Sequence, residues 1–148
     1  MNDPEARFEE LLANLREQEY RITPQRMALL RLLAASEGHP SAAKLHEQLR
    51  ERFPTLSLAT VYKTLNLLKG MGEVQELSFC DDDTRYDGND PSPHPHLVCI
   101  RCHKIIDLDV AELDDLEQDV ARTWDFRVLN HRLDFFGICS ECQRLETD

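Results

Sequence analysis

Two pairs of cysteines carry the clearest chemical pattern in this chain of 148 residues. Cys99 pairs with Cys102 and Cys139 with Cys142, each in the spacing Cys-x-x-Cys. This spacing puts two thiolates on one turn, where they can chelate a tetrahedral zinc ion, and two such turns complete a four-thiolate site. The 36 residues between the pairs are more than a compact zinc ribbon has. A zinc ion here would therefore hold together a domain with its own helix and strand.

Disulfide bonds and a redox motif are the alternatives for these cysteines. Disulfides are disfavoured in a reducing cytoplasm, and two matching pairs favour a metal over a redox-active pair. We therefore predict a structural zinc ion bound by all four paired cysteines. The fifth cysteine, Cys80, stands alone in a predicted hairpin and is assigned no role.

A second group of residues could hold a different metal. His94 and His96 can point at one ion, because side chains at i and i+2 of an extended segment share a face. Asp87 and Asp107 lie on either side of them, and His39 lies in the N-terminal half. Three imidazoles and two carboxylates suit Fe(II), Mn(II) or Zn(II) and are too hard for Cu(I). The five residues span 69 positions, so their spacing by itself also fits ordinary surface histidines beside prolines.

Helical periodicity dominates the first half of the chain, where four start signals each precede an apolar stripe. The fourth helix runs to a stop at residues 70–72, and two short strands, 73–79 and 84–87, follow around a turn. Helices followed by a hairpin are the order expected of a winged helix. The start signals are Asp3-Pro4, Thr23-Pro24, Ser41 and Ser57.

The second half of the chain has a different pattern. Residues 89–93 indicate a linker, and strand-like segments follow at 96–100 and 104–108. A helix with one apolar face comes next, and a long strand is predicted over 126–138. The apolar face comprises Val110, Leu113, Leu116 and Val120.

The fourth predicted helix has two different faces. One is apolar and is made of Leu58, Val61, Leu65 and Leu68; the other presents Ala59, Tyr62, Lys63 and Asn66. A methyl group and an aromatic ring can contact a thymine methyl, a cation can contact phosphate or guanine, and an amide can read adenine. An ordinary amphipathic surface helix would show a similar pattern, so the helix predicts DNA binding only together with its surroundings.

The charge of the chain is unevenly distributed. The net charge is −11, yet residues 20–69 contain eight basic and three acidic residues, a net of +5. A basic segment joined to an acidic one predicts two domains, of which the first faces phosphate groups. The acidic N-terminus has no apolar run, so we expect no signal peptide. No stretch is apolar enough to span a membrane, and we expect a cytoplasmic protein.

Six stretches of the sequence resemble the ferric uptake regulator (Fur) family over nearly the whole chain. The resemblance implies an α+β protein with a winged-helix DNA-binding domain at 1–88, a hinge at 89–95 and an α/β dimerisation domain at 96–148 that contains the four-cysteine zinc site. The matching stretches are Arg21–Arg26, His39–Ala42, Ser57–Leu65, Arg85–Asp87, His94–Cys102 and His131–Cys139.

The resemblance also implies roles for single residues. His39, Asp87, His94, His96 and Asp107 would bind the regulatory metal, Fe(II) or Mn(II). Arg21 would lie against the minor groove of operator DNA, and Tyr62 would belong to the recognition helix. His131 matches part of a further metal site of some relatives, but a hydrogen-bonded core histidine is the favoured interpretation.

The subtype follows from Asp107 and from the His94-Pro95-His96 motif. Both resemble the peroxide-sensing subgroup, because iron-sensing members usually have Glu at the first position. We therefore predict a homodimeric, metal-dependent repressor, not an enzyme, that is released from DNA when peroxide oxidises a ligand histidine. An iron-responsive repressor is the first alternative, followed by a zinc sensor, a non-haem iron enzyme and a structural zinc module that binds another protein.

Overall fold

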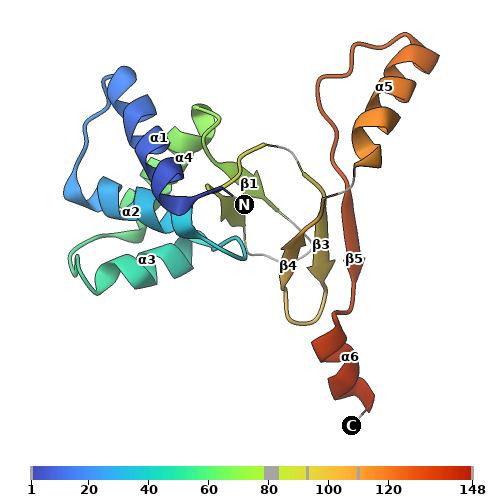
Figure 1. Ribbon diagram of the computed structural model, residues 1–148. Coiled ribbons are helices and arrows are strands. Elements are labelled where there is room, and N and C mark those ends of the chain that lie inside the picture. The colour runs from blue at the N-terminus through green and yellow to red at the C-terminus, as the bar shows by residue number, and fades with distance from the viewer. Residues whose placement is uncertain (1, 79–83, 93, 110, 148) are drawn as a thin grey trace. The chain divides into compact units, whose positions relative to one another are not determined.

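The computed structural model describes residues 2–78, 84–92, 94–109 and 111–147. The chain divides into two compact units, unit 1 at residues 1–92 and unit 2 at residues 93–148 (Figure 1). Unit 1 contains helices α1–α4 and strands β1 and β2, and unit 2 contains strands β3–β5 and helices α5 and α6. The predicted α+β class is confirmed, whereas the exact hinge at 89–95 stays a prediction.

All four helices of unit 1 begin where the sequence predicts. Each N-cap side chain accepts a hydrogen bond from a backbone N–H group of the first turn, which satisfies a donor that has no partner within the helix. The N-caps are Asp3, Thr23, Ser41 and Ser57, and the helices are α1 Pro4–Glu17, α2 Pro24–Ala35, α3 Ala42–Arg50 and α4 Leu58–Gly70.

The core of unit 1 lies between these helices. Leu11, Leu30 and Leu65 are fully buried, one from each of three helices. The expected apolar face of α4 needs one correction: Leu58 is 37% exposed, and Thr64 is buried instead. Leu58 is the first residue of α4 and adjoins the exposed Ser57 and Ala59, so it lies outside the packed part of the helix.

A two-stranded antiparallel hairpin follows α4. Strand β1, Gln75–Leu77, pairs with β2, Arg85–Asp87, and Gln75 lies opposite Asp87. Both strands are shorter than predicted. The intervening turn, including Cys80, lies outside the described residues.

Unit 2 contains a three-stranded sheet in the order β4-β3-β5. Strand β3, His96–Cys99, pairs in antiparallel fashion with β4, Ile105–Asp107, and in parallel fashion with β5, Asp134–Gly137. Helix α5 covers Glu112–Trp124, and α6 covers Ser140–Thr147. Helix α5 has the predicted apolar residues on one face, although Val110 lies outside the described part of the chain.

Two predictions for unit 2 are wrong. The long strand expected over 126–138 is limited to β5, because its only described partner, β3, pairs with it from Asp134 to Gly137. A strand without a neighbour leaves its backbone hydrogen bonds unmade. Helix α6 was not expected at all.

No described helix is both long and apolar enough to cross a membrane.

Candidate metal centres and DNA-binding helix

The four paired cysteines form one cluster within unit 2. Their sulfur atoms all lie within 4.8 Å of one another. Cys99 Sγ lies 3.8 Å from Cys142 Sγ, and Cys102 Sγ lies 3.7 Å from Cys139 Sγ. These separations are far longer than a disulfide bond of about 2.05 Å. Zinc–sulfur bonds of about 2.3 Å in a tetrahedron put the sulfurs ~3.8 Å apart, so the cluster has the size of a zinc site.

Strand ends and a short helix position these cysteines. Cys99 ends β3 and lies opposite Gly137 of β5, which brings the second pair to the first. Cys139 then precedes α6, and its backbone N–H group donates to Cys99 Sγ at 3.4 Å. Cys142 lies in the first turn of α6. The unpredicted helix is therefore what places the fourth sulfur.

The electrostatics of the cluster favour a bound cation. Backbone N–H groups of Cys102 and Cys139 donate to the Cys99 sulfur and lower the pKa of this thiol to about 6. A hydrogen bond with Cys139, burial and the neighbouring sulfurs raise the pKa of Cys142 to about 12. Four thiolates held this close would repel one another unless a metal ion compensated their charge. The donor set and its size fit Zn(II).

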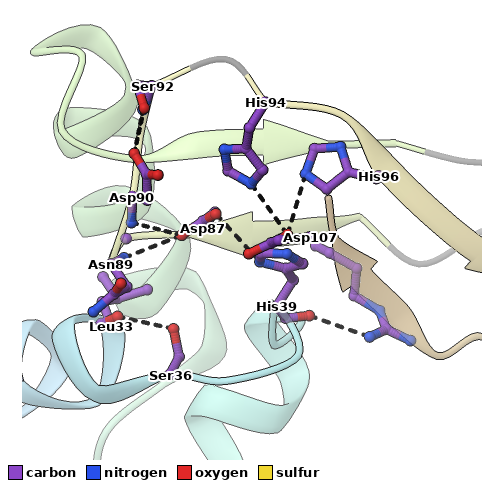
Figure 2. A network of polar contacts seen from close by, with 12 residues as sticks. Leu33, Ser36, His39, Asp87, Asn89, Asp90, Ser92, His94, His96 and Asp107 are labelled. Carbon is purple, nitrogen blue, oxygen red and sulfur yellow. Dashed lines mark hydrogen bonds and ion pairs between the residues drawn. The ribbon is translucent and has the colours of Figure 1, made fainter. Parts of the chain in front are cut away.

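Three candidate ligands of the regulatory metal lie together in unit 2. His94 Nε2 lies 3.1 Å and His96 Nε2 3.6 Å from the same oxygen, Asp107 Oδ1. The two imidazole rings are 4.6 Å apart between centroids. Figure 2 shows both rings turned toward Asp107. The β3–β4 ladder produces this arrangement, because His96 lies directly opposite Asp107 in its register.

The other two candidate ligands lie together in unit 1. His39 Nδ1 is 3.5 Å from Asp87 Oδ2. The other oxygen of Asp87 accepts the backbone N–H groups of Asn89, at 3.1 Å, and Asp90, at 3.0 Å (Figure 2). The turn that follows β2 therefore fixes the carboxylate with one oxygen directed at His39.

The loop before α3 fixes His39 itself. His39 has a φ of 55°, a left-handed conformation that costs a residue with a side chain roughly 1–2 kcal/mol. Arg85 Nη1 donates to the His39 carbonyl at 3.1 Å, and Tyr86 N–H donates to the Pro40 carbonyl at 3.0 Å. Strand β2 thus holds the loop and also carries Asp87, so one strand positions both ligands.

The polar face of α4 is exposed as predicted. Ala59, Tyr62, Lys63 and Asn66 all lie at the surface of unit 1, and Tyr62 is 42% exposed. Arg21 is also exposed, and its carbonyl accepts from Arg26 Nη1 at 2.8 Å. A groove between the starts of α2 and α4 is lined by Arg21, Arg26 and Lys63 among others. Unit 1 thus presents basic side chains next to the residues of α4 that are candidates for contacting DNA bases.

Residues 17–136 match the model of the ferric uptake regulator family. The chain belongs to this family. The peroxide-responsive repressor PerR of Staphylococcus epidermidis is 41% identical over 136 residues, which cover 92% of this chain and 90% of that protein.

Solved structures agree with the family assignment. The ferric uptake regulator Fur of Helicobacter pylori, described as having three functional metal-binding sites, aligns with a TM-score of 0.82 at 24% identity over 96% of this chain and 95% of its own. At this identity the likeness shows the fold. PerR from Streptococcus pyogenes aligns with a TM-score of 0.53 at 35% identity and covers 92% of each chain.

Several residues beside the candidate metal ligands were not predicted from the sequence. Asn89 and Asp134 each support a candidate ligand, yet an isolated amide or carboxylate gives no spacing signal. His131 is hydrogen-bonded as expected, with its Nδ1 2.6 Å from Glu117 Oε2. Its side chain is 34% exposed, however, so its assignment to the core is wrong for the described chain: the strand predicted around it does not form.

Proposed function

We propose that this member of the ferric uptake regulator family is a dimeric, metal-dependent repressor that binds operator DNA through a winged helix. The observation that carries the proposal is a pair of incomplete ligand sets. His39 and Asp87 in unit 1 offer two donors, and His94, His96 and Asp107 in unit 2 offer three. Neither set alone fills an octahedral site, and together they supply the nitrogen and oxygen donors that Fe(II) or Mn(II) prefers.

An ion bound by both sets would select one orientation of the two units. A ligand shifts a protein toward whichever conformer binds it better. In a dimer, this orientation sets the separation of the two α4 helices, which must match the spacing of the DNA half-sites. Loss of the ion would then release the DNA. Both units would therefore contribute ligands to the switch.

The zinc site has a different role in this proposal. Zn(II) held by Cys99, Cys102, Cys139 and Cys142 would join the end of β3 to α6 and stabilise unit 2 outright, because binding to a structural zinc site contributes directly to folding. It has four protein ligands and no open position. Zinc is therefore structural here, and the histidine and aspartate sets are regulatory.

The homodimer is proposed from the apolar surface of unit 2. Leu116, Val120 and Trp124 of α5 are 57%, 42% and 72% exposed, and this helix buries none of its described residues. Phe126 and Leu129 in the following segment are 72% and 77% exposed. Exposed apolar surface of this extent marks an association site. A second copy of unit 2 would cover α5 and supply a strand neighbour for residues 126–132, which the described β3–β5 pairing does not include.

Peroxide is the proposed signal. The relatives from Staphylococcus and Streptococcus are named for the peroxide response, and Asp107 is the carboxylate that resembles their subgroup. Fe(II), when bound, would supply the electron that reduces peroxide beside its ligands. His39 and His94 would lie next to it, and oxidation of either ring would remove a nitrogen donor from its set.

The test compares DNA binding of protein loaded with Fe(II) or Mn(II), before and after peroxide. We expect both metals to support binding, and peroxide to abolish it only with Fe(II). Mass spectrometry should then find an added oxygen in the peptide that contains His39 or His94. If the iron-loaded protein stays on DNA after peroxide and its histidine peptides gain no mass, the protein is an iron-responsive repressor instead. DNA binding that does not depend on metal would reject the proposed metal switch.

A further inference from the structure

His96 lies between two carboxylates of unit 2. Its Nε2 faces Asp107, at 3.6 Å, and its Nδ1 lies 3.1 Å from Asp134 Oδ1. Asp107 belongs to the proposed ligand set, and Asp134 does not. We infer that Asp134 is a positioning residue that keeps the proton of His96 on Nδ1 and thereby presents Nε2 to the regulatory metal. This inference rests on the proposed function, since it concerns the same metal site.

The backbone brings the two residues together. Strands β3 and β5 are parallel, and Asp134 is the direct partner of His96 in their register. Directly paired residues point to the same face of a sheet. The backbone N–H group of His96 also donates to the Leu133 carbonyl at 3.2 Å, which fixes the start of β5 against β3. The approach of the two side chains is therefore set by the ladder.

Asp134 is in turn held by a cation. Arg132 Nε donates to Asp134 Oδ2 at 2.6 Å, while Asp134 Oδ1 faces His96. The arginine directs one oxygen of the carboxylate away from the ring and leaves the other for the imidazole.

The shorter of the two carboxylate contacts favours one tautomer: Asp134 Oδ1 lies 3.1 Å from Nδ1, whereas Asp107 Oδ1 lies 3.6 Å from Nε2. A neutral imidazole has one N–H group and one free electron pair, and a metal ion needs the electron pair. An ionised carboxylate can only accept hydrogen bonds, so Asp134 favours the proton on Nδ1. Nε2 then carries the electron pair on the side of Asp107 and His94. Carboxylates in this position orient metal-binding histidines and strengthen their basicity.

A purely structural role for Asp134 is the alternative. In that case its bonds to His96 and Arg132 would only fasten β5 to β3. Its loss would lower the stability of unit 2 without changing the proton on His96. The tautomer of His96 and the affinity for the regulatory metal therefore distinguish the two roles.

The experiment uses the full-length, zinc-loaded protein without regulatory metal. Long-range proton–nitrogen NMR of protein labelled with ¹⁵N-histidine reports which ring nitrogen of His96 carries the proton. Wild type should show Nδ1–H, and Asp134→Ala should show a mixture or Nε2–H. Mn(II) titration should find 10- to 100-fold weaker binding in Asp134→Ala, as is typical for loss of such a partner. Asp134→Glu keeps the carboxylate and should recover part of the affinity.

Two further variants separate the possible failures. Asp119→Asn makes a related change at an exposed position of α5 and should leave both measurements unchanged. His96→Ala tests the site itself: if it binds Mn(II) as well as wild type does, the proposed ligand set is wrong. If His96→Ala loses Mn(II) while Asp134→Ala keeps wild-type affinity and the Nδ1–H tautomer, the ligand set stands and the inference about Asp134 is overturned.

Discussion

The two residues after Asp87, Gly88 and Asn89, hold this proposed ligand in place through close packing and hydrogen bonds. Gly88 follows Asp87, and a Cβ atom added there would lie 2.7 Å from Leu33 Cβ. Its carbonyl accepts from Arg7 Nε at 2.8 Å. The next residue, Asn89, donates its amide to the Ala34 carbonyl at 2.6 Å. The turn that orients Asp87 is therefore packed directly against α1 and α2.

Gly88→Ala should destabilise unit 1 because the new methyl group overlaps α2. Overpacking of this kind costs about 1–3 kcal/mol, and the displaced turn should also weaken regulatory-metal binding. Urea unfolding and Mn(II) titration measure the two effects. Gly70→Ala is the matched control, because a Cβ atom there meets nothing within 4 Å. Equal stability of the two variants would contradict the packing argument.

Lys63 provides a test of DNA contact at the same scale. It is exposed on α4 and lines the groove beside Arg21. If it contacts a phosphate, Lys63→Ala should weaken all DNA sequences alike and lower the slope of log affinity against log salt by ~1. Fluorescence anisotropy at several salt concentrations measures the slope. Lys104→Ala, a lysine of unit 2 paired with Glu141, should leave the slope unchanged; a wild-type slope in Lys63→Ala would exclude the contact.

Residue patterns in the sequence predict only part of these sites. Start signals such as Ser57 and the cysteine spacing act locally, so they could be recognised without the fold. Asn89 supports Asp87 through its backbone N–H group, which no residue type signals, and Asp134 acts on a residue that tertiary structure brings to it. Asp134 supports His96 only because of the β3–β5 register, which no local pattern in the chain specifies.

At the scale of elements, the β3–β5 ladder links the two kinds of metal site. His96 and Asp134 pair at one end, and Cys99 and Gly137 pair at the other. The zinc cluster follows directly on that second end. Only two residues of β3, Leu97 and Val98, therefore separate a proposed regulatory ligand from a proposed zinc ligand, and the same ladder positions both.

Cys99→Ser should lose the zinc ion and most of the stability of unit 2. Apparent binding free energies of structural zinc are about 10–16 kcal/mol, far more than a unit of this size can replace. Zinc release assays and hydrogen exchange should show the loss in residues 94–147, with α1–α4 still protected. Cys80→Ser is the control and should retain zinc. A zinc-free variant with wild-type protection in unit 2 would refute the structural role.

The strand predicted over residues 126–138 shows why secondary structure cannot be predicted fully from local sequence. Alternating residues over 126–133 fit a strand, but strand formation also requires a paired neighbour. The sequence does not show which segment pairs with these residues. The exposed Phe126 and Leu129 indicate that the missing partner is apolar, which leads from the element to the assembly.

At the scale of the whole molecule, the apolar surface of α5 predicts a dimer that can be broken. Replacing Leu116 and Val120 by Asp should give a monomer, because charges would be buried in the interface at a cost of several kcal/mol. Light scattering after size-exclusion chromatography measures the mass. Leu145→Asp on α6 is the control, since Leu145 is 75% exposed outside this surface. A double variant that stays dimeric would place the interface elsewhere.

The two units differ in charge, which indicates that they have different functions. Residues 20–69 are basic, and the acidic residues are concentrated after residue 72. We therefore expect attraction to phosphate groups to come from unit 1, because the acidic unit 2 would be repelled by DNA. This distribution supports the proposal that unit 1 binds DNA through α4 and Arg21, and that the second copy is bound by unit 2.

The proposed peroxide response is the property of the assembled molecule that we expect to depend most on one carboxylate. The resemblance to the family implies Glu at this position in iron-sensing members, and the shorter side chain of Asp107 would hold its oxygen with less freedom. In unit 2 this oxygen already lies 3.1 Å from His94 Nε2. Asp107→Glu should preserve metal-dependent DNA binding, because a carboxylate ligand remains, and it should slow the release of DNA by peroxide.

The measurement is DNA release from Fe(II)-loaded protein over time after a low dose of peroxide. The Mn(II)-loaded forms of wild type and Asp107→Glu should both stay on DNA, which shows that the substitution has not weakened binding itself. Asp109→Glu makes the same change two residues away at an exposed position and should respond like wild type. If Asp107→Glu releases DNA as fast as wild type and gains the same oxygen on its histidine peptides, then the length of this carboxylate does not set the peroxide response, and the distinction between the subtypes must lie in the histidine ligands.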